Sequence, residues 1–199
     1  MTATNQDPAP FATSMAWLLD NPWARFRARG MVRRLPLRPG MRVVDIGCGP
    51  GRLTLPVARA VGEDGEVLAV DVQPAMLRRL EGHARRDRLR NVRTLAAAAG
   101  SGALPRDRFD LALLVAVLGE IPTDRRRPAL QEIARALRPG GLLVVFEGLI
   151  DPHRQRRDAI LGMATAAGLE LAGEERRIAS IQLFLRRPAD ASTLRSPEA

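Results

Sequence analysis

The sequence predicts an α/β protein, a three-layer sandwich in which helices cover both faces of a mostly parallel β-sheet. Two observations lead to this fold class. From residue 41 onward, short apolar runs alternate with helical stretches, which is the order of elements that builds a parallel sheet. After the fifth apolar run and one more helix, two closely spaced strands follow, and they favour an antiparallel hairpin at the end of the sheet.

Each element is expected from its own pattern. A turn at Arg38-Pro39-Gly40 precedes the first strand. Nearly continuous apolar runs predict five parallel strands, at residues 41–47, 66–72, 91–97, 108–117 and 141–150. Helical periodicity predicts helices at residues 52–62, 74–87, 125–138 and about 158–167. The hairpin strands are expected at residues 169–175 and 179–187.

The chain is expected to form one domain over residues 1–199. This length suffices for one full core, and no repeat or long linker divides it. We place a helical segment at residues 1–37, the α/β core at residues 38–188 and a polar tail at residues 189–199. The pattern of the N-terminal segment is broken at Asn21-Pro22, so two short helices are expected there.

The composition is that of a globular protein, with 46% hydrophobic and 27% charged residues. The longest apolar stretches, at residues 111–118 and 141–146, are much shorter than the roughly 20 residues that cross a bilayer. Residues 1–10 lack a signal-peptide pattern, so we expect a cytoplasmic location. Cys48 is the only cysteine, which excludes an intramolecular disulfide and a cysteine-cluster metal site.

The chain is strongly basic, with a formal net charge of +9. All its Lys and Arg positions are arginine, and they are scattered along the sequence. This distribution favours a generally basic, solvated surface over a dedicated nucleic-acid face, although a nucleic-acid partner stays open. The oligomeric state is not predicted.

A glycine-rich turn follows directly after the first strand. Gly47, Gly49 and Gly51 permit unusual backbone angles and leave room for a ligand to approach the main chain. Position 52 is Arg52, so the G-x-G-x-x-G/A spacing of a dinucleotide fold is not met, which argues against NAD or FAD. The alternative is a sharp turn without a ligand.

An acidic residue ends the second strand. Asp71 lies 26 residues after Asp45, and a carboxylate at this position can accept hydrogen bonds from both hydroxyls of a ribose. The glycine turn, the acid at the strand end and the strand-helix-strand context agree with one another. Together they predict a site for a nucleoside-containing cofactor.

Four segments in succession resemble the motifs of class I S-adenosylmethionine-dependent methyltransferases: VVDIGCGPGRLTLPVA, VLAVDVQPAML, FDLALLVAVLGEIP and ALQEIARALRPGGLLVVFE. They cover residues 38–147 in the order of that family, and the hairpin fits its seven-stranded, Rossmann-like sheet. The chain is most similar to small, stand-alone UbiE-like enzymes that methylate quinone precursors and other small molecules. The resemblance implies S-adenosyl-L-methionine as cofactor and a small-molecule methyl acceptor.

The resemblance also assigns residues to the cofactor. The methionine part is expected to lie against Gly47, Gly49 and Gly51, in a loop that Asp45 supports. Asp71 is expected to bind the ribose, and Val72 is expected to lie beside the adenine. Cys48 in the loop and Val115 in the fourth strand complete the expected set. In this family a helix before the core often covers the acceptor pocket, so residues 1–37 are expected to form a lid. Packing of Phe11, Trp17, Trp23 and Phe26 against the core is an equal alternative, and a membrane-surface helix is a third.

One feature departs from the family. Many relatives carry an acid shortly before a Leu-Pro pair, where it receives the adenine amino group, but residues 99–105 of this chain are AGSGALP. Backbone groups or Ser101 would have to replace it. We therefore expect somewhat weaker adenine recognition.

Two residues are candidates for catalysis. Glu120 follows the fourth strand, where ligands bind in open α/β sheets and where many relatives have His, so it is a candidate base. The alternative is a Glu that stabilises the start of the next helix. His153 follows the fifth strand at the same edge, but we favour a turn residue there. His83 is expected to be solvated, and no metal site is expected.

The sequence is compatible with three functions. The first is methylation of oxygen, carbon or nitrogen in a small molecule by in-line displacement. The second is an RNA- or protein-directed methyltransferase that uses the basic surface. The third is a non-catalytic cofactor-binding protein, which the intact glycine turn and Asp71 disfavour. Because Cys48 is the only cysteine and lies in the cofactor loop, cysteine-dependent methylation of a base at C5 is excluded, and the shortage of cysteine likewise excludes thiolate-dependent arsenite methylation.

Overall fold

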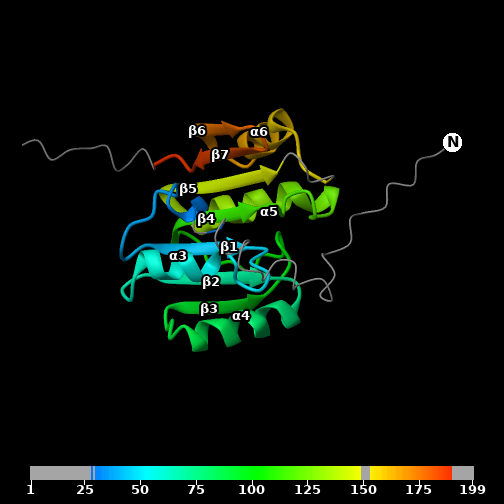
Figure 1. Cartoon of the computed structure of the whole chain (residues 1–199). Helices are drawn as coiled ribbons and strands as arrows, with labels where there is room; N and C mark the ends of the chain where they lie inside the picture. The colour runs from blue at the N-terminus through cyan, green and yellow to red at the C-terminus, as the bar shows by residue number, and fades with distance from the viewer. Residues whose placement is uncertain (1–27, 29, 149–152, 190–199) are drawn as a thin grey trace, which may run out of the picture.

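The computed structural model describes residues 28, 30–148 and 153–189. In this part of the chain, seven strands form one sheet in the order β3-β2-β1-β4-β5-β7-β6, which Figure 1 shows from bottom to top. The strands are β1 Arg42–Ile46, β2 Glu66–Asp71, β3 Val92–Ala96, β4 Phe109–Val115, β5 Leu137–Gly148, β6 Glu170–Arg177 and β7 Ser180–Arg186. The helices are α3 Thr54–Val61, α4 Pro74–Arg86, α5 Thr123–Ala136 and α6 Arg157–Ala166.

The sheet is parallel except at one strand. β1 pairs in parallel with β2 on one side and with β4 on the other, and β3 and β5 extend the sheet in the same direction. β7 is antiparallel to both of its neighbours, β5 and β6. The predicted α/β class, with a seven-stranded, mostly parallel sheet and a C-terminal antiparallel hairpin, is confirmed.

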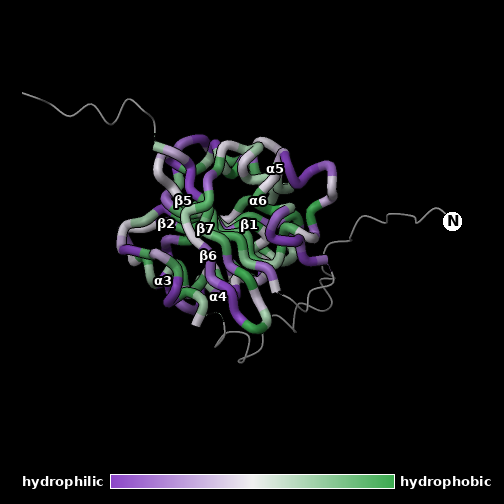
Figure 2. The backbone as a smooth tube through the Cα atoms, turned by 90° about the horizontal axis from the view of Figure 1, so that it is seen from above, coloured by the Kyte–Doolittle hydropathy of each residue, from purple (hydrophilic) through white to green (hydrophobic). Residues whose placement is uncertain are grey.

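The core lies on both faces of the sheet because successive strand side chains point to opposite sides. In β1, Val44 and Ile46 belong to the cluster that packs against α5 and α6, whereas Val43 belongs to the cluster on the α3 face. A third cluster lies under α4 and includes Leu80. Each fully buried aliphatic side chain contributes about 1.5–3 kcal/mol through removal of apolar surface from water. In Figure 2 the strands in the middle of the view are mostly hydrophobic.

One predicted boundary is wrong. The helix expected over residues 125–138 ends at Ala136, and Leu137 and Arg138 belong to β5. Leu137 has an extended backbone (φ −67°, ψ 141°), and Arg138 precedes Pro139, whose ring disfavours a helical conformation of the residue before it. Leu137 pairs with Phe109, so this early start lengthens the contact between β4 and β5.

The N-terminal lid and its aromatic residues lie outside the described residues, since residues 1–27 and 29 are not described. The lid therefore stays a prediction, as do the domain boundaries and the tail. At the start of the described part, Ala28, Val32 and Leu35 are buried in the cluster on the α3 face. No helix in the described ranges is long and apolar enough to cross a membrane.

The strand order places the functional edge of the sheet. The chain leaves β1 toward β2 on one side, whereas β4 and β5 extend the sheet on the other side. The sheet therefore has its topological switch point between β1 and β4, and in open α/β sheets ligands bind beyond the carboxyl ends of the strands at this point.

Candidate functional site

A cavity of about 920 Å³ opens beyond the carboxyl ends of β1, β2 and β4. Its walls combine the glycine turn, the end of β2, the loop after β3 and the loops after β4 and β5. It contains nearly all of the predicted site residues: Asp45, Gly47, Cys48, Gly49, Asp71, Val72, Val115, Glu120 and His153. Residues that are separated by more than 100 positions in the sequence therefore face one space.

The glycine turn after β1 is shaped by the main chain. The amide groups of Gly47 and Cys48 both donate to the carbonyl of Val70, at 2.8 and 3.1 Å, which holds the turn against β2. Gly47 and Gly49 have φ values of +68° and +54°, which glycine adopts without strain. A Cβ atom at Gly47 would overlap Val117, whereas Gly49 has open space on its Cβ side. The turn thus presents bare main chain to the cavity.

Gly51, which the family resemblance assigns to the cofactor, lies outside the cavity lining. Its φ is +90°. A Cβ atom here would overlap the Leu80 side chain of α4. A glycine is required at position 51 because α4 packs closely against the turn. The sequence pattern alone does not distinguish a glycine required for packing from one required for contact with a ligand.

Asp71 connects β2 to the glycine turn. Its Oδ2 accepts a hydrogen bond from the Gly49 amide at 2.9 Å, and its Oδ1 accepts one from the Gln73 amide at 2.8 Å. The residue is 8% exposed and lines the cavity. Each oxygen of a carboxylate can accept more than one hydrogen bond, so both retain capacity for the hydroxyl groups of a ribose.

Asp45 lies beneath the turn at the end of β1. Its Oδ2 accepts a hydrogen bond of 2.6 Å from the hydroxyl of Thr54, the first residue of α3. Burial raises the pKa of Asp45 to about 6, although the hydrogen bond from Thr54 acts in the opposite direction. Asp45 thus fixes the helix to the strand on the inner side of the loop.

Cys48 is buried within the turn, and burial raises the pKa of its thiol well above the usual range. Its Sγ lies 3.6 Å from the Gly49 carbonyl. Because the thiolate is the reactive form of cysteine, this environment disfavours nucleophilic or redox chemistry at Cys48. The side chain is part of the loop packing.

The expectation that His83 is solvated is wrong. His83 is half-buried on α4, and its Nδ1 lies 3.1 Å from the carbonyl oxygen of Pro50 in the glycine turn. A hydrogen bond here gives α4 a second contact with the turn, in addition to that of Leu80 with Gly51. The sequence contains no sign of this contact, because it joins residues 33 positions apart.

The loops after β4 and β5 meet at the other end of the cavity. Glu120 and His153 both line it. A Cβ atom at Gly119 would overlap the main chain of His153, so the two loops are in direct contact. Helix α5 begins at Thr123 and has Asp124 in its first turn, so Glu120 lies outside the helix whose start it was alternatively expected to stabilise.

Arg126 of α5 holds these loops together. Its guanidinium donates to the carbonyl oxygens of Ile121 and Gly119, at 2.9 and 3.1 Å, and to Oε1 of Gln155 at 3.1 Å. The side chain of Gln155 in turn donates to the carbonyl oxygen of His153 at 2.8 Å. This network fixes the main chain that carries Glu120 and His153.

Ala116, in the same wall, has a left-handed backbone with φ +55°. This conformation raises the energy of an alanine by about 1–2 kcal/mol. The hydrogen bond from its amide to the carbonyl of Phe146, at 2.8 Å, compensates in part. Strained backbone of this kind is typical of functional sites.

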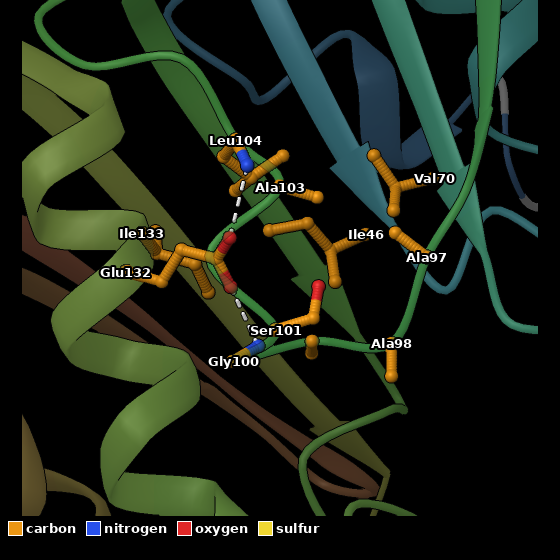
Figure 3. A pocket seen from close by; sticks show the side chains of 11 residues that line it. Ile46, Val70, Ala97, Ala98, Gly100, Ser101, Ala103, Leu104, Glu132 and Ile133 are labelled. Carbon is orange, nitrogen blue, oxygen red and sulfur yellow. Dashed lines mark hydrogen bonds between the residues drawn. The ribbon is translucent and has the colours of Figure 1, made fainter.

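A side chain that the sequence analysis did not single out supports the loop after β3. Glu132 of α5 is 5% exposed, and Figure 3 shows its carboxylate directed at the main chain of that loop. Oε2 accepts a hydrogen bond from the Gly100 amide at 2.6 Å, and Oε1 accepts one from the Leu104 amide at 2.9 Å. The sequence sign was a Glu among the buried positions of an amphipathic helix, between Leu130 and Ile133.

The geometry fits a nucleoside-containing cofactor. The cavity offers bare main chain at Gly49, a carboxylate at Asp71 and the apolar side chain of the next residue, Val72. Val72 is 54% exposed, which is unusual for a valine and places an apolar surface where a base could lie. Within the described ranges, no group of three or more His, Cys, Asp and Glu could hold a metal ion.

Comparison with known families places most of the parallel sheet in a described family. The family described as a methyltransferase domain matches residues 43–141. This range runs from β1 into β5 and contains the glycine turn, Asp71, Glu120 and Glu132.

Curated relatives of this chain include proteins named ubiquinone/menaquinone biosynthesis C-methyltransferase UbiE. The protein of Azotobacter vinelandii is 37% identical over 131 residues, which cover 63% of this chain and 47% of the relative. The protein of a Shewanella species is 36% identical over 136 residues, which cover 67% of this chain and 53% of the relative. The chain therefore spans about half the length of the curated relatives it matches.

Solved structures share the fold. A SAM-dependent methyltransferase from Aquifex aeolicus has a TM-score of 0.80 and 21% identity, and the match covers 89% of this chain and 99% of that one. The cyclase SpnF has a TM-score of 0.72 and 21% identity, and the match covers 84% and 82%. Because a protein named as a cyclase has the same architecture, the fold alone does not define the reaction.

Proposed function

Because the chain belongs to the class I S-adenosylmethionine-dependent methyltransferases, we propose that it transfers a methyl group from this cofactor to a small-molecule acceptor. The observation that carries the proposal is one cavity in which the glycine turn and Asp71 face the same space as Glu120 and His153. A volume of about 920 Å³ is at the upper end of the range for small-molecule pockets. It leaves room for an acceptor beside the cofactor.

The cofactor is held mainly through main chain and one carboxylate. Gly47 and Gly49 lie against its methionine part, because both line the cavity with main chain and the Cβ side of Gly49 is open. Asp71 accepts hydrogen bonds from the ribose hydroxyls, and its bonds to Gly49 and Gln73 keep it oriented beforehand. Val72 covers one face of the adenine.

The contribution of the chain to the reaction is placement. The bound cofactor supplies an electrophilic methyl group on a sulfonium sulfur, which is already a good leaving group. The cavity walls would hold the acceptor so that its nucleophilic atom faces this methyl group and can displace the sulfur in line. The strained turn at Ala116 and the side chain of Val115 form the wall nearest the switch point.

Glu120 serves as the general base when the acceptor must lose a proton. It lines the cavity from the loop after β4, and the Arg126 network fixes the main chain on either side of it, at Gly119 and Ile121. His153 faces the same space and is a second candidate. A positioned base contributes about 10²–10⁴-fold in such proton transfers.

The acceptor class we favour is an activated carbon of a small ring compound, since the similar proteins are named C-methyltransferases. The acceptor end of the cavity has an apolar wall formed by Val117, Ile121 and Pro122, which suits an apolar ring. Acceptors with oxygen or nitrogen nucleophiles are the alternatives, and a cytoplasmic location remains part of the proposal.

An RNA- or protein-directed activity is less well supported. Part of the positive charge is balanced within the molecule, because several arginines form ion pairs with carboxylates. These pairs include Arg59–Asp87, Arg108–Glu66, Arg138–Asp110, Arg157–Glu174 and Arg187–Asp107. Such pairs lower the density of unbalanced charge that phosphate binding requires.

The decisive experiment is calorimetric titration of the full chain with S-adenosylmethionine and, separately, with NAD. Micromolar binding of S-adenosylmethionine alone supports the proposal. Quinols, phenols and amines are then tested as acceptors by the release of S-adenosylhomocysteine. Absence of S-adenosylmethionine binding would overturn the proposal and favour a protein that retains the fold without the activity.

A further inference from the structure

The part of the β3–β4 loop that faces the adenine end of the cavity has no acidic side chain. Residues 97–105 have the sequence AAAGSGALP. Four of them line the large cavity, namely Ala97, Ala98, Ala99 and Ser101. Alanine side chains form no hydrogen bonds, so polar recognition of a base by this stretch depends mainly on its main chain. Main-chain groups are selective only if they are held at fixed positions.

Glu132 holds that main chain from behind. Its two carboxylate oxygens bind the amides of Gly100 and Leu104, at 2.6 and 2.9 Å, which Figure 3 shows as two dashed lines converging on one side chain. Hydrogen bonds to a carboxylate are about twice as strong as neutral ones. Glu132 is 5% exposed as a residue, and a buried carboxylate is unfavourable unless it is hydrogen-bonded in this way, so the loop and the helix depend on each other.

Other contacts fix the same loop. The amide of Ala97 donates to the Asp71 carbonyl, and the amide of Ser101 donates to the Ala98 carbonyl, both at 3.2 Å. Gly100 has φ +83°, and a Cβ atom there would lie 2.9 Å from the Ala129 amide nitrogen of α5. A space of only about 10 Å³, roughly that of one water molecule, lies between the loop and α5. The loop therefore has little freedom to shift toward the helix.

We propose that Glu132 is a positioning residue for adenine recognition. It fixes the loop main chain at Gly100 and Leu104 and thereby holds the neighbouring residues 97–101 in the geometry that binds the adenine amino edge. This inference rests on the proposed cofactor site. It assigns Glu132 no contact with the cofactor, since the carboxylate is occupied by the two loop amides on the other side of the main chain.

The role requires two acceptors on one side chain. A glutamine at this position has one acceptor oxygen and one donor group, so only one of the two amides would keep its partner. The other amide would face an NH₂ group, and a buried donor without an acceptor is destabilising. Glu132→Gln therefore disturbs the loop while it changes the volume of the side chain little.

The test measures ligand affinity rather than turnover. Calorimetry compares S-adenosylhomocysteine with its hypoxanthine counterpart, S-inosylhomocysteine, in which the donor and acceptor pattern of the base edge is reversed. The wild-type protein should bind the adenine compound at least about tenfold more tightly, because mismatched polar partners in a site are strongly unfavourable. Glu132→Gln should weaken binding of the adenine compound by about tenfold and bring the two affinities close together.

A matched control is Glu81→Gln. Glu81 lies on α4, and its Oε1 accepts a hydrogen bond of 2.7 Å from the Thr94 hydroxyl in β3, away from the loop. This variant should retain the wild-type affinities and the wild-type preference. Loss of preference in the control as well would show a general effect of removing a charge and would overturn the proposal.

The outcomes separate the two proposals. If the wild-type protein binds neither compound, the proposed cofactor site is wrong. If it binds the adenine compound but Glu132→Gln does so equally well, or loses affinity for both compounds to the same degree, the role of Glu132 is wrong and the cofactor site stands. If Glu132→Gln does not fold, the role of Glu132 is tested by two measurements on the wild-type protein. Slow hydrogen exchange at the Gly100 and Leu104 amides together with an adenine preference supports the role, and the absence of either overturns it.

Discussion

Asp71 combines a structural and a binding function in one side chain. Its oxygens orient the Gly49 and Gln73 amides and also face the cavity. Asp71→Asn replaces one acceptor by a donor and should weaken S-adenosylmethionine binding at least about tenfold, since hydrogen bonds to charged groups are worth about 1.5–3 kcal/mol. Calorimetry measures the change. Asp124→Asn, at a side chain that is 78% exposed, is the control and should bind like wild type. Unchanged affinity of Asp71→Asn would contradict the ribose assignment.

Glu120 makes a different kinetic prediction. If it removes a proton from the acceptor, Glu120→Gln should lower kcat by about 10²–10⁴-fold. The dissociation constant of S-adenosylmethionine should stay within about twofold, because Glu120 lies at the acceptor end of the cavity. Turnover with an identified acceptor and calorimetry with the cofactor measure the two quantities. If the affinity for S-adenosylmethionine falls by the same factor as kcat, Glu120 acts in cofactor binding and not as a base.

Between elements, the glycine turn and α4 are packed against each other. Gly51 and Gly49 both have positive φ, but only at Gly51 would a Cβ atom overlap a neighbour, the Leu80 side chain. Gly49→Ala should lower the free energy of unfolding by about 1–2 kcal/mol through backbone strain. Gly51→Ala should lower it by at least about 1 kcal/mol more, because overpacking is added to the strain. Urea unfolding monitored by circular dichroism gives both values. Equal losses would mean that α4 can move away from the turn.

The elements were predictable because their determinants are local. Apolar runs and glycine turns lie within a few residues of the structure that they specify, so the strands and the turn at Gly47 followed from the sequence. The end of α5 was the exception. Leu137 continues the apolar period of the helix, and its pairing with Phe109 of β4 decides its conformation.

The site was predictable only in part for the same reason. Asp45 and Asp71 lie at the ends of β1 and β2, and Glu120 lies in the loop after β4, so the strand ends located all three at the ligand-binding edge. The contacts of His83 with Pro50 and of Glu132 with Gly100 join residues about 30 positions apart. They depend on how α4 and α5 dock on the sheet, which no local pattern contains.

The stability of the whole molecule should depend on pH through Asp45. Burial raises its pKa from 3.8 to about 6, so the folded state binds its proton more tightly than the unfolded state. This contribution to stability is complete below about pH 4 and is lost as the pH rises through 6. The full loss corresponds to about 3 kcal/mol.

Asp45→Asn isolates this effect, because an amide oxygen can still accept the Thr54 hydrogen bond and does not titrate. The difference in free energy of unfolding between Asp45→Asn and wild type should shift by about 1 kcal/mol in favour of the variant between about pH 5 and about pH 7.5. Urea titrations at both pH values measure the shift. If the difference in free energy of unfolding does not change with pH, burial does not raise the pKa of Asp45.

The position of β7 has a consequence for how the chain folds during synthesis. β7 is made after β6, yet it lies inside the sheet, between β5 and β6. Until residues 180–186 have left the ribosome, β5 keeps an open edge of unpaired backbone groups next to the buried Val144 and Val145. The nascent chain therefore cannot close its sheet strand by strand. A ribosome-bound intermediate that ends after β6 should expose an edge able to pair with other chains, and should be a preferred client of chaperones.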